Sequence, residues 1–129
     1  MSTIRDDRRY SREHEWVLPL DTTGQLRVGI TDHAQDQLGD VVFVDLPKVG
    51  TDVATAEPVG AVESVKTVSD IYSPVAGKIV SVNTALAMSP ELINKSPYDE
   101  GWIFEIEVAD PAEVEGLLDA RAYAELTAE

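Results

Sequence analysis

Residues 58–82, PVGAVESVKTVSDIYSPVAGKIVSV, form the stretch on which the organisation of the chain depends. On both sides of Lys66 the sequence is rich in valine, isoleucine and threonine, often in alternation, which is typical of extended strands. This pattern predicts two strands that meet at a turn holding Lys66. Because an ammonium group in the middle of a small sheet would have to leave the core to stay hydrated, we expect Lys66 to project from the hairpin tip into water.

An exposed lysine on a turn is most often an ordinary solvated side chain, but the sequence around Lys66 is more specific. ESVKTVSD (63–70), followed closely by SPVAG (73–77), is similar to the lipoyl-attachment signature of the glycine cleavage system H protein family. Three further stretches resemble the other motifs of that family in the same order, and four motifs are far more specific than one. The three are SREHEWV (11–17), VGITDHAQDQLGDVVFVDLP (28–47) and PELINKSPYDEGW (90–102).

The resemblance implies a mostly β fold, a barrel-sandwich hybrid like that of lipoyl and biotinyl carrier domains. Such a fold has two small antiparallel sheets with short helices and a C-terminal helix. A weak internal repeat between residues 39–53 and 76–86 suggests two similar half-sheets related by a pseudo-twofold axis. The length of 129 residues indicates one domain. We expect it to span residues 1–129, with its core over 10–108 and a helical tail over 110–128.

Outside the lysine hairpin, apolar residues in alternation or in short runs predict four more strands. The first two should form a hairpin through DTTG (21–24), while VGTDV (49–53) and Gly77 should form turns. Ser73 and Pro74 should break the second arm of the lysine hairpin. The four strands are expected at residues 16–20, 25–30, 41–46 and 102–108.

Capping residues predict three helical segments, while the first nine residues show no apolar period and are expected to be loosely ordered. Thr31 can cap a helix over 32–38 that lies over the sheet and ends at Gly39. Ser89 can begin a second short helix. Asp110 can begin the tail, whose apolar side chains can pack back on the sheet. Those side chains are Val114, Leu117, Leu118, Tyr123 and Leu126.

The charge balance excludes whole classes of partner. Lys plus Arg number 10 and Asp plus Glu number 24, which gives a formal net charge of -14. Nucleic acid and anionic membranes would be repelled, whereas proteins with basic patches would be attracted. No apolar run approaches the roughly 20 residues that span a bilayer, and the N-terminus lacks the apolar segment of a secretory signal. We expect a soluble monomer, cytoplasmic if bacterial and in the mitochondrial matrix if a mature eukaryotic form.

No constellation in the sequence indicates a catalytic site. The two histidines, His14 and His33, lie in different segments without a nucleophile motif, and no phosphate-binding loop or dinucleotide fingerprint is present. The absence of cysteine excludes disulfides, thiolate metal sites and thiol nucleophiles in the chain itself. It also means that no thiol of the chain could trap a dithiolane as a mixed disulfide. We therefore expect a non-catalytic, cofactor-carrying component of a multienzyme system, with no metal site.

The resemblance implies that Lys66 carries lipoate in amide linkage, attached by a lipoate ligase or lipoyltransferase that reads the flanking residues Glu63, Ser64 and Asp70. In the family, the lipoyl arm takes an aminomethyl group from the pyridoxal-phosphate-dependent glycine decarboxylase. It delivers this group to the aminomethyltransferase, which uses tetrahydrofolate, and dihydrolipoyl dehydrogenase reoxidises the dithiol. The alternative reading that these flanking residues are only hydrated turn residues stays open.

An aminomethyl group hydrolyses in water, so a carrier should shelter it between enzymes. Carboxylates in a partly dry cleft would hold its cationic amine best. Glu15 and Asp70 match stretches that form the cleft in the family. Glu13 stands where the family often has a serine, so the contact that this serine makes in the family is not carried over to this chain.

Three alternatives share parts of this pattern. Biotinyl carriers place their lysine between methionines, whereas Lys66 lies between Val65 and Thr67. Lipoyl domains of 2-oxoacid dehydrogenase acyltransferases usually have an aspartate directly before the lysine, where this chain has valine. A lipoyl relay, which donates lipoate to other lipoyl domains, is not distinguished from glycine cleavage by the sequence.

Overall fold

Two antiparallel sheets make up most of the protein in a computed structural model, which describes residues 3–21 and 24–127. The larger sheet has six strands, in the order β1 (Arg9–Tyr10), β2 (Glu15–Pro19), β3 (Gln25–Ile30), β9 (Phe104–Val108), β8 (Gly77–Val82) and β5 (Asp52–Val53). The smaller has three, in the order β4 (Val41–Asp45), β6 (Pro58–Ser64) and β7 (Val68–Tyr72). The predicted mostly β, barrel-sandwich fold is confirmed.

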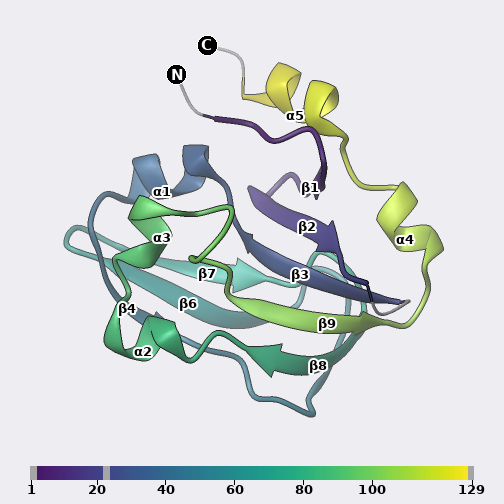
Figure 1. The fold of residues 1–129 in the computed structure, drawn as a ribbon, viewed down its shortest axis with the longest axis horizontal. Helices are drawn as coiled ribbons and strands as arrows, with labels where there is room; N and C mark the ends of the chain where they lie inside the picture. Colours follow the sequence, from purple (N-terminus) through teal and green to yellow (C-terminus); the bar gives the residue numbers. More distant parts are fainter. Residues whose placement is uncertain (1–2, 22–23, 128–129) are drawn as a thin grey trace.

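Within the described residues, five short helices lie around the sheets. Three of them gather at the end of the molecule that carries the β6–β7 tip; of the other two, α4 (Ala112–Glu115) lies at the opposite end and α5 (Ala120–Leu126) lies beside the N-terminal segment (Figure 1). The first three are α1 (Asp32–Leu38), α2 (Ala85–Met88) and α3 (Leu92–Lys95). No helix in the described ranges is long and apolar enough to cross a membrane.

Local sequence signals account for several of these elements. The β2–β3 hairpin is confirmed, although Thr22 and Thr23 of its predicted turn lie outside the described residues. The Thr31 hydroxyl caps α1 by accepting a hydrogen bond from the Ala34 N–H at 3.2 Å, and Gly39 ends the helix with a φ of 80°. The predicted lysine hairpin forms as β6 and β7.

The core has an aliphatic part between the sheets and an aromatic part beside the larger sheet. Val62 and Ile71 fasten the lysine hairpin to the aliphatic part, since each is only 1% exposed. The aromatic part holds Tyr10, Trp16, Tyr98 and Tyr123. Tyr10 and Trp16 come from β1 and β2, Tyr98 from the loop before β9, and Tyr123 from α5. The aromatic cluster therefore joins the two terminal segments to the sheet.

The prediction that residues 1–9 are loosely ordered is wrong for the described part of that segment. Arg8 is 5% exposed, with its guanidinium carbon 4.7 Å from the Trp16 ring centroid and 5.3 Å from that of Tyr98. Its Nη1 atom donates a hydrogen bond to the Tyr98 carbonyl at 2.8 Å. Cation–π contacts and a buried hydrogen bond therefore hold the segment in place, and neither depends on apolar periodicity.

The helical predictions need three corrections. Ser89 does not begin a helix through its side chain: its backbone N–H closes α2, which was not predicted, and α3 begins at Leu92. The tail is not one helix but two, because Leu118 leaves the helical path to pair with the Tyr10 backbone. This backbone pairing divides the tail into the two short helices α4 and α5.

The two half-sheets suggested by the internal repeat differ in size, since β4 belongs to the three-stranded sheet and β8 to the six-stranded sheet. The predicted turn at 49–53 contains β5, which pairs with β8. Gly77 is the first residue of β8 and not a turn residue. A Cβ atom at Gly77 would lie 2.1 Å from the Glu107 carbonyl oxygen, so the position needs glycine for close approach of two strands.

We predict that Gly77→Ala lowers the free energy of unfolding by about 1–3 kcal/mol, because the added methyl group has to push β8 and β9 apart. Gly116→Ala is the matched control: the nearest atom to its added Cβ would be 3.5 Å away and its φ is -80°. Urea unfolding of both variants measures the difference. Equal stability of the two variants would show that the strands accommodate the methyl group without strain.

Candidate functional site

The tip of the β6–β7 hairpin is closed by the Ser64 side chain. The Ser64 hydroxyl accepts hydrogen bonds from the backbone N–H groups of Lys66 and Thr67, at 3.3 and 3.2 Å, and lies 3.2 Å from the Thr67 carbonyl oxygen, to which it can donate. The Ser64 N–H donates to the same carbonyl at 2.8 Å. Ser64 is only 9% exposed, so its hydroxyl shapes the turn from within. That a lipoylating enzyme recognises Ser64 stays a prediction.

Lys66 lies exposed at this tip, as expected from the sequence. The neighbouring Val65 N–H donates to the Asp40 carbonyl at 3.0 Å, which fastens the tip to the segment between α1 and β4. A Cβ atom at Gly39 would lie 3.5 Å from Lys66 Cε and 4.0 Å from Nζ, so the lysine stem passes over the end of α1. The root of Lys66 is therefore fixed, while its amine has no ion-pair partner among the described residues.

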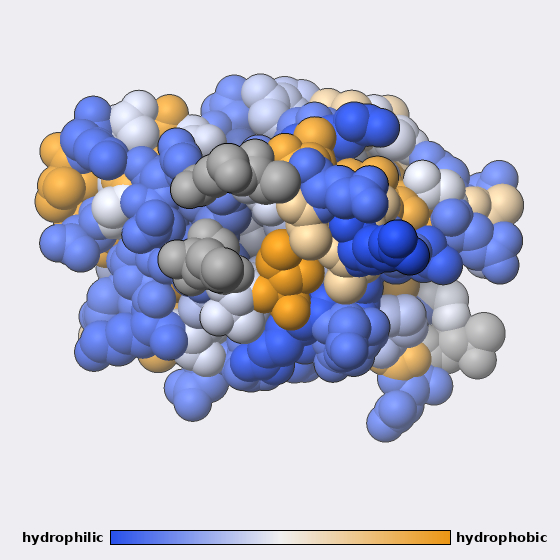
Figure 2. All heavy atoms as spheres, turned by 90° about the horizontal axis from the view of Figure 1, so that it is seen from above, coloured by the Kyte–Doolittle hydropathy of each residue, from blue (hydrophilic) through white to orange (hydrophobic). Residues whose placement is uncertain are grey.

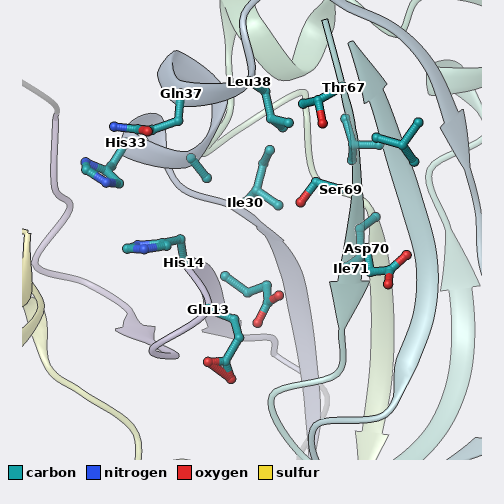
Figure 3. A pocket seen from close by; sticks show the side chains of 14 residues that line it. Glu13, His14, Ile30, His33, Gln37, Leu38, Thr67, Ser69, Asp70 and Ile71 are labelled. Atoms are coloured by element: carbon teal, nitrogen blue, oxygen red, sulfur yellow. The ribbon is translucent and has the colours of Figure 1, made fainter.

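A cavity of about 400 Å³ lies beside the hairpin, between β7, α1 and the loop that precedes β2. Figure 3 shows His14, His33 and Gln37 on one side of this cavity and Thr67, Ser69 and Ile71 on the other. The lysine stem passes over Gly39, directly after the cavity residues Gln37 and Leu38. A long group attached to Lys66 can therefore fold back into the cavity.

Glu15 forms part of the cavity wall and is almost completely buried, with 2% of its surface exposed. Its Oε1 atom accepts a hydrogen bond from the Ser11 hydroxyl at 2.6 Å, and its Oε2 atom accepts one from the Tyr72 N–H at 3.2 Å. Burial raises the pKa of Glu15 to about 7, although these two hydrogen bonds oppose the shift. Near neutral pH the cavity thus holds a carboxyl group that a nearby cation would ionise.

The cavity wall that faces β7 is organised by the hydroxyl group of Tyr123. This hydroxyl lies 2.8 Å from His14 Nδ1 and 2.7 Å from the Thr31 hydroxyl, so it joins the loop before β2 to the N-terminus of α1. His14 has a φ of 67°, a left-handed conformation that is uncommon for residues other than glycine. Its ring lies 4.8 Å from the ring of His33, and burial lowers the pKa of His14. The C-terminal helix therefore helps to set the shape of the cavity.

The other predicted residues do not all reach the cavity. Asp70 borders it but is exposed and pairs with Ala61, and Figure 3 shows its carboxylate on the opposite side of β7 from the Ser69 hydroxyl. Glu63 is half-buried on the same outer face of the hairpin. Of the predicted acidic residues, Glu15 is the one whose carboxylate is both buried and part of the wall.

Sequence reasoning missed the inward-facing residue Ser69 and the lining role of His14, His33 and Gln37. Ser69 could have been found from the alternation of β7, since it shares a face with the buried Ile71. The two histidines could not, because their proximity depends on the Tyr123 hydroxyl, which joins the loop before β2 to the N-terminus of α1. No group of three or more His, Cys, Asp or Glu side chains in the described part of the chain is arranged to hold a metal ion.

Comparisons with known proteins point to one family. Residues 8–129 match the family model described as "Glycine cleavage H-protein". A glycine cleavage system H protein of Enterobacter sp. (strain 638) is 58% identical over 98% of this chain and 97% of its own length, and one of Micrococcus luteus is 55% identical over 98% and 99%. The crystal structure of a glycine cleavage system H protein from Mycobacterium marinum superposes with a TM-score of 0.85, at 45% identity and over 95% of this chain and 97% of that one.

The raised pKa of Glu15 predicts a specific dependence of stability on pH. Because the pKa rises from 4.5 to about 7 on folding, the folded protein retains a proton that the unfolded chain has lost in this window. Stability should therefore fall as pH rises from 4.5 to 7, by on the order of 3 kcal/mol for this group. Glu15→Gln resembles the protonated form, so its free energy of unfolding, measured with urea, should not show this decrease between pH 4.5 and 7.

Exposed Glu107 on β9 provides the control, and Glu107→Gln should keep the wild-type pH dependence. The lowered pKa of His14 adds stability as pH rises towards 6.5, but it does so in every variant and cancels in the comparison. Parallel stability curves for wild type and Glu15→Gln would contradict the assignment.

Proposed function

The chain belongs to the glycine cleavage H-protein family, and we propose that it is the lipoyl carrier of the glycine cleavage system, with lipoate in amide linkage on Lys66. In this role it takes the aminomethyl group of glycine from the glycine decarboxylase to the aminomethyltransferase and is reset by dihydrolipoyl dehydrogenase. The observation that carries the proposal is the exposed Lys66 amine on a closed hairpin tip, beside a cavity with a buried carboxyl group.

The hairpin gives Lys66 what an attachment site needs. Acylation requires the neutral amine to attack an activated lipoyl carbonyl, so that an amide bond forms, the activating group leaves and the amine loses a proton. The exposed and unpaired amine can enter the pocket of a lipoate ligase or lipoyltransferase. The turn, which the Ser64 hydroxyl closes, meanwhile fixes the backbone from which the Lys66 side chain extends. Once attached, lipoate supplies a dithiolane that carries the cargo and undergoes reduction and oxidation.

The cavity gives the carrier a place to shelter its cargo. The amine of the aminomethyl group is cationic, and Glu15 in its ionised form offers a compensating charge away from water. An adjacent cation stabilises the carboxylate, so loading should lower the pKa of Glu15 from its value of about 7. Ser69 and Thr67 provide further hydroxyl groups along the β7 side of the cavity. Asp70 can act only from the rim, because it lies on the outer face of β7.

The cavity also favours the shuttle over a lipoyl relay. A relay would need an accessible lysine and an enzyme that exchanges its lipoyl group, but it has no use for a buried carboxyl group next to the arm. We further propose that the chain is a monomeric carrier and not an enzyme. The bacterial source of the relatives favours the cytoplasm over a mitochondrial matrix as its location.

Incubation with a lipoate ligase, lipoate and ATP should add one lipoyl group to the wild-type protein, as measured by intact-protein mass spectrometry. Lys66→Arg should gain no mass, because a guanidinium stays protonated and is not nucleophilic near neutral pH. Lys78→Arg, which changes an exposed lysine on β8, should be acylated like the wild type. A lipoyl group on Lys66→Arg, or its loss from Lys78→Arg, would refute Lys66 as the attachment site.

A further inference from the structure

Four large apolar side chains are exposed around the root of Lys66. Val42, Phe43, Val65 and Val68 are 54%, 52%, 70% and 60% exposed, and we call them the tip patch. They are four of the seven large hydrophobic side chains exposed within the described residues. Scattered exposed hydrophobics are ordinary, but several gathered on one hairpin and its neighbouring strand, beside a proposed modification site, indicate a contact surface.

Strand pairing brings the members of the tip patch together. Phe43 pairs with Glu63, and Glu63 pairs with Val68, so the three side chains form one row across the outer face of the small sheet. A bulge between Val41 and Phe43 leaves Val42 exposed next to this row. Val65 immediately precedes Lys66 at the tip. In Figure 2, apolar surface is visible at the end of the molecule that carries the hairpin tip in Figure 1.

Acidic side chains accompany the tip patch. Asp45, Glu63 and Asp70 lie on the same outer face of the three strands, as the register of β4, β6 and β7 requires. The formal net charge of the whole chain is -14. A complementary surface would therefore have an apolar centre flanked by Lys or Arg side chains. A second copy of this chain does not fit this description, because two strongly acidic surfaces repel each other.

We propose that the tip patch is the docking surface for the enzyme that acylates Lys66, an inference that rests on the proposed function. This enzyme must bring its activated lipoyl group to the lysine amine itself, which lies only one side chain away from the hairpin backbone. Its surface must therefore close over the residues next to Lys66. Enzymes that act later receive the far end of the lipoyl arm and can work without covering the root of the lysine.

The test compares rates of lipoylation at a range of concentrations of the unmodified protein. The triple variant Val42→Thr/Phe43→Thr/Val65→Thr should raise KM by about tenfold or more. Its kcat should stay within about twofold, because the patch contributes binding that is equal in ground and transition states. Val42→Thr/Val65→Thr preserves side-chain shape and should show a smaller rise in the same direction. Val49→Thr/Leu126→Gln changes two exposed apolar residues outside the tip patch, at 59% and 43% exposure, and should leave KM unchanged.

The outcomes separate this inference from the proposed function. Failure of the wild type to be lipoylated at Lys66 would overturn both. Lipoylation of the wild type with an unchanged KM for the triple variant would overturn the tip patch alone. Normal lipoylation followed by slow glycine–bicarbonate exchange with the decarboxylase would assign the patch to that later partner and refute the inference. A wild-type dimer in sedimentation that dissociates in the triple variant would refute it in favour of self-association.

Discussion

The hydrogen bond from the Tyr72 N–H to the Glu15 carboxyl group is the contact on which the functional architecture depends. In its own sheet, β7 pairs with β6 on one side, and its other edge borders the cavity. An open edge leaves backbone groups that need partners. Glu15, from the larger sheet, supplies one of them and so ties the two sheets together at the cavity wall. Because the same carboxyl group is buried, a contact that supports the fold also provides a titratable group beside the lysine arm.

The β6–β7 hairpin has two faces with different roles. Its inner face contributes Val62 and Ile71 to the core and Ser69 to the cavity, which keeps the strands from moving relative to the rest of the molecule. Its outer face carries the tip patch and acidic side chains. Period-two alternation separates the two roles residue by residue. The hairpin can thus hold the cavity in shape while it offers an exposed surface to another protein.

Much of the fold could be predicted from the sequence because its signals are local. Alternation of apolar residues predicted the main strands, Thr31 predicted the cap of α1, and the strand pattern on both sides of Lys66 placed it at a hairpin tip. The order of the N-terminal segment was missed because Arg8 is held between the rings of Trp16 and Tyr98, and Tyr98 is 90 residues away in the sequence. Gly77 was misread because glycine permits close strand approach as well as turns. In the cavity, Glu15 was found through the family motif, whereas the wall set by Tyr123 depends on tertiary contacts.

The central claim is that the cavity receives the cargo of the Lys66 arm and that Glu15 responds to its charge. The most direct test is to follow the side-chain carboxyl carbon of Glu15 by ¹³C NMR through a pH titration of the unmodified, lipoylated and aminomethyl-loaded protein. We predict a pKa of about 7 in the unmodified protein, a similar value after lipoylation and a clear decrease on loading. The same pKa in all three forms would contradict the account, because it would show that the cationic amine does not approach Glu15.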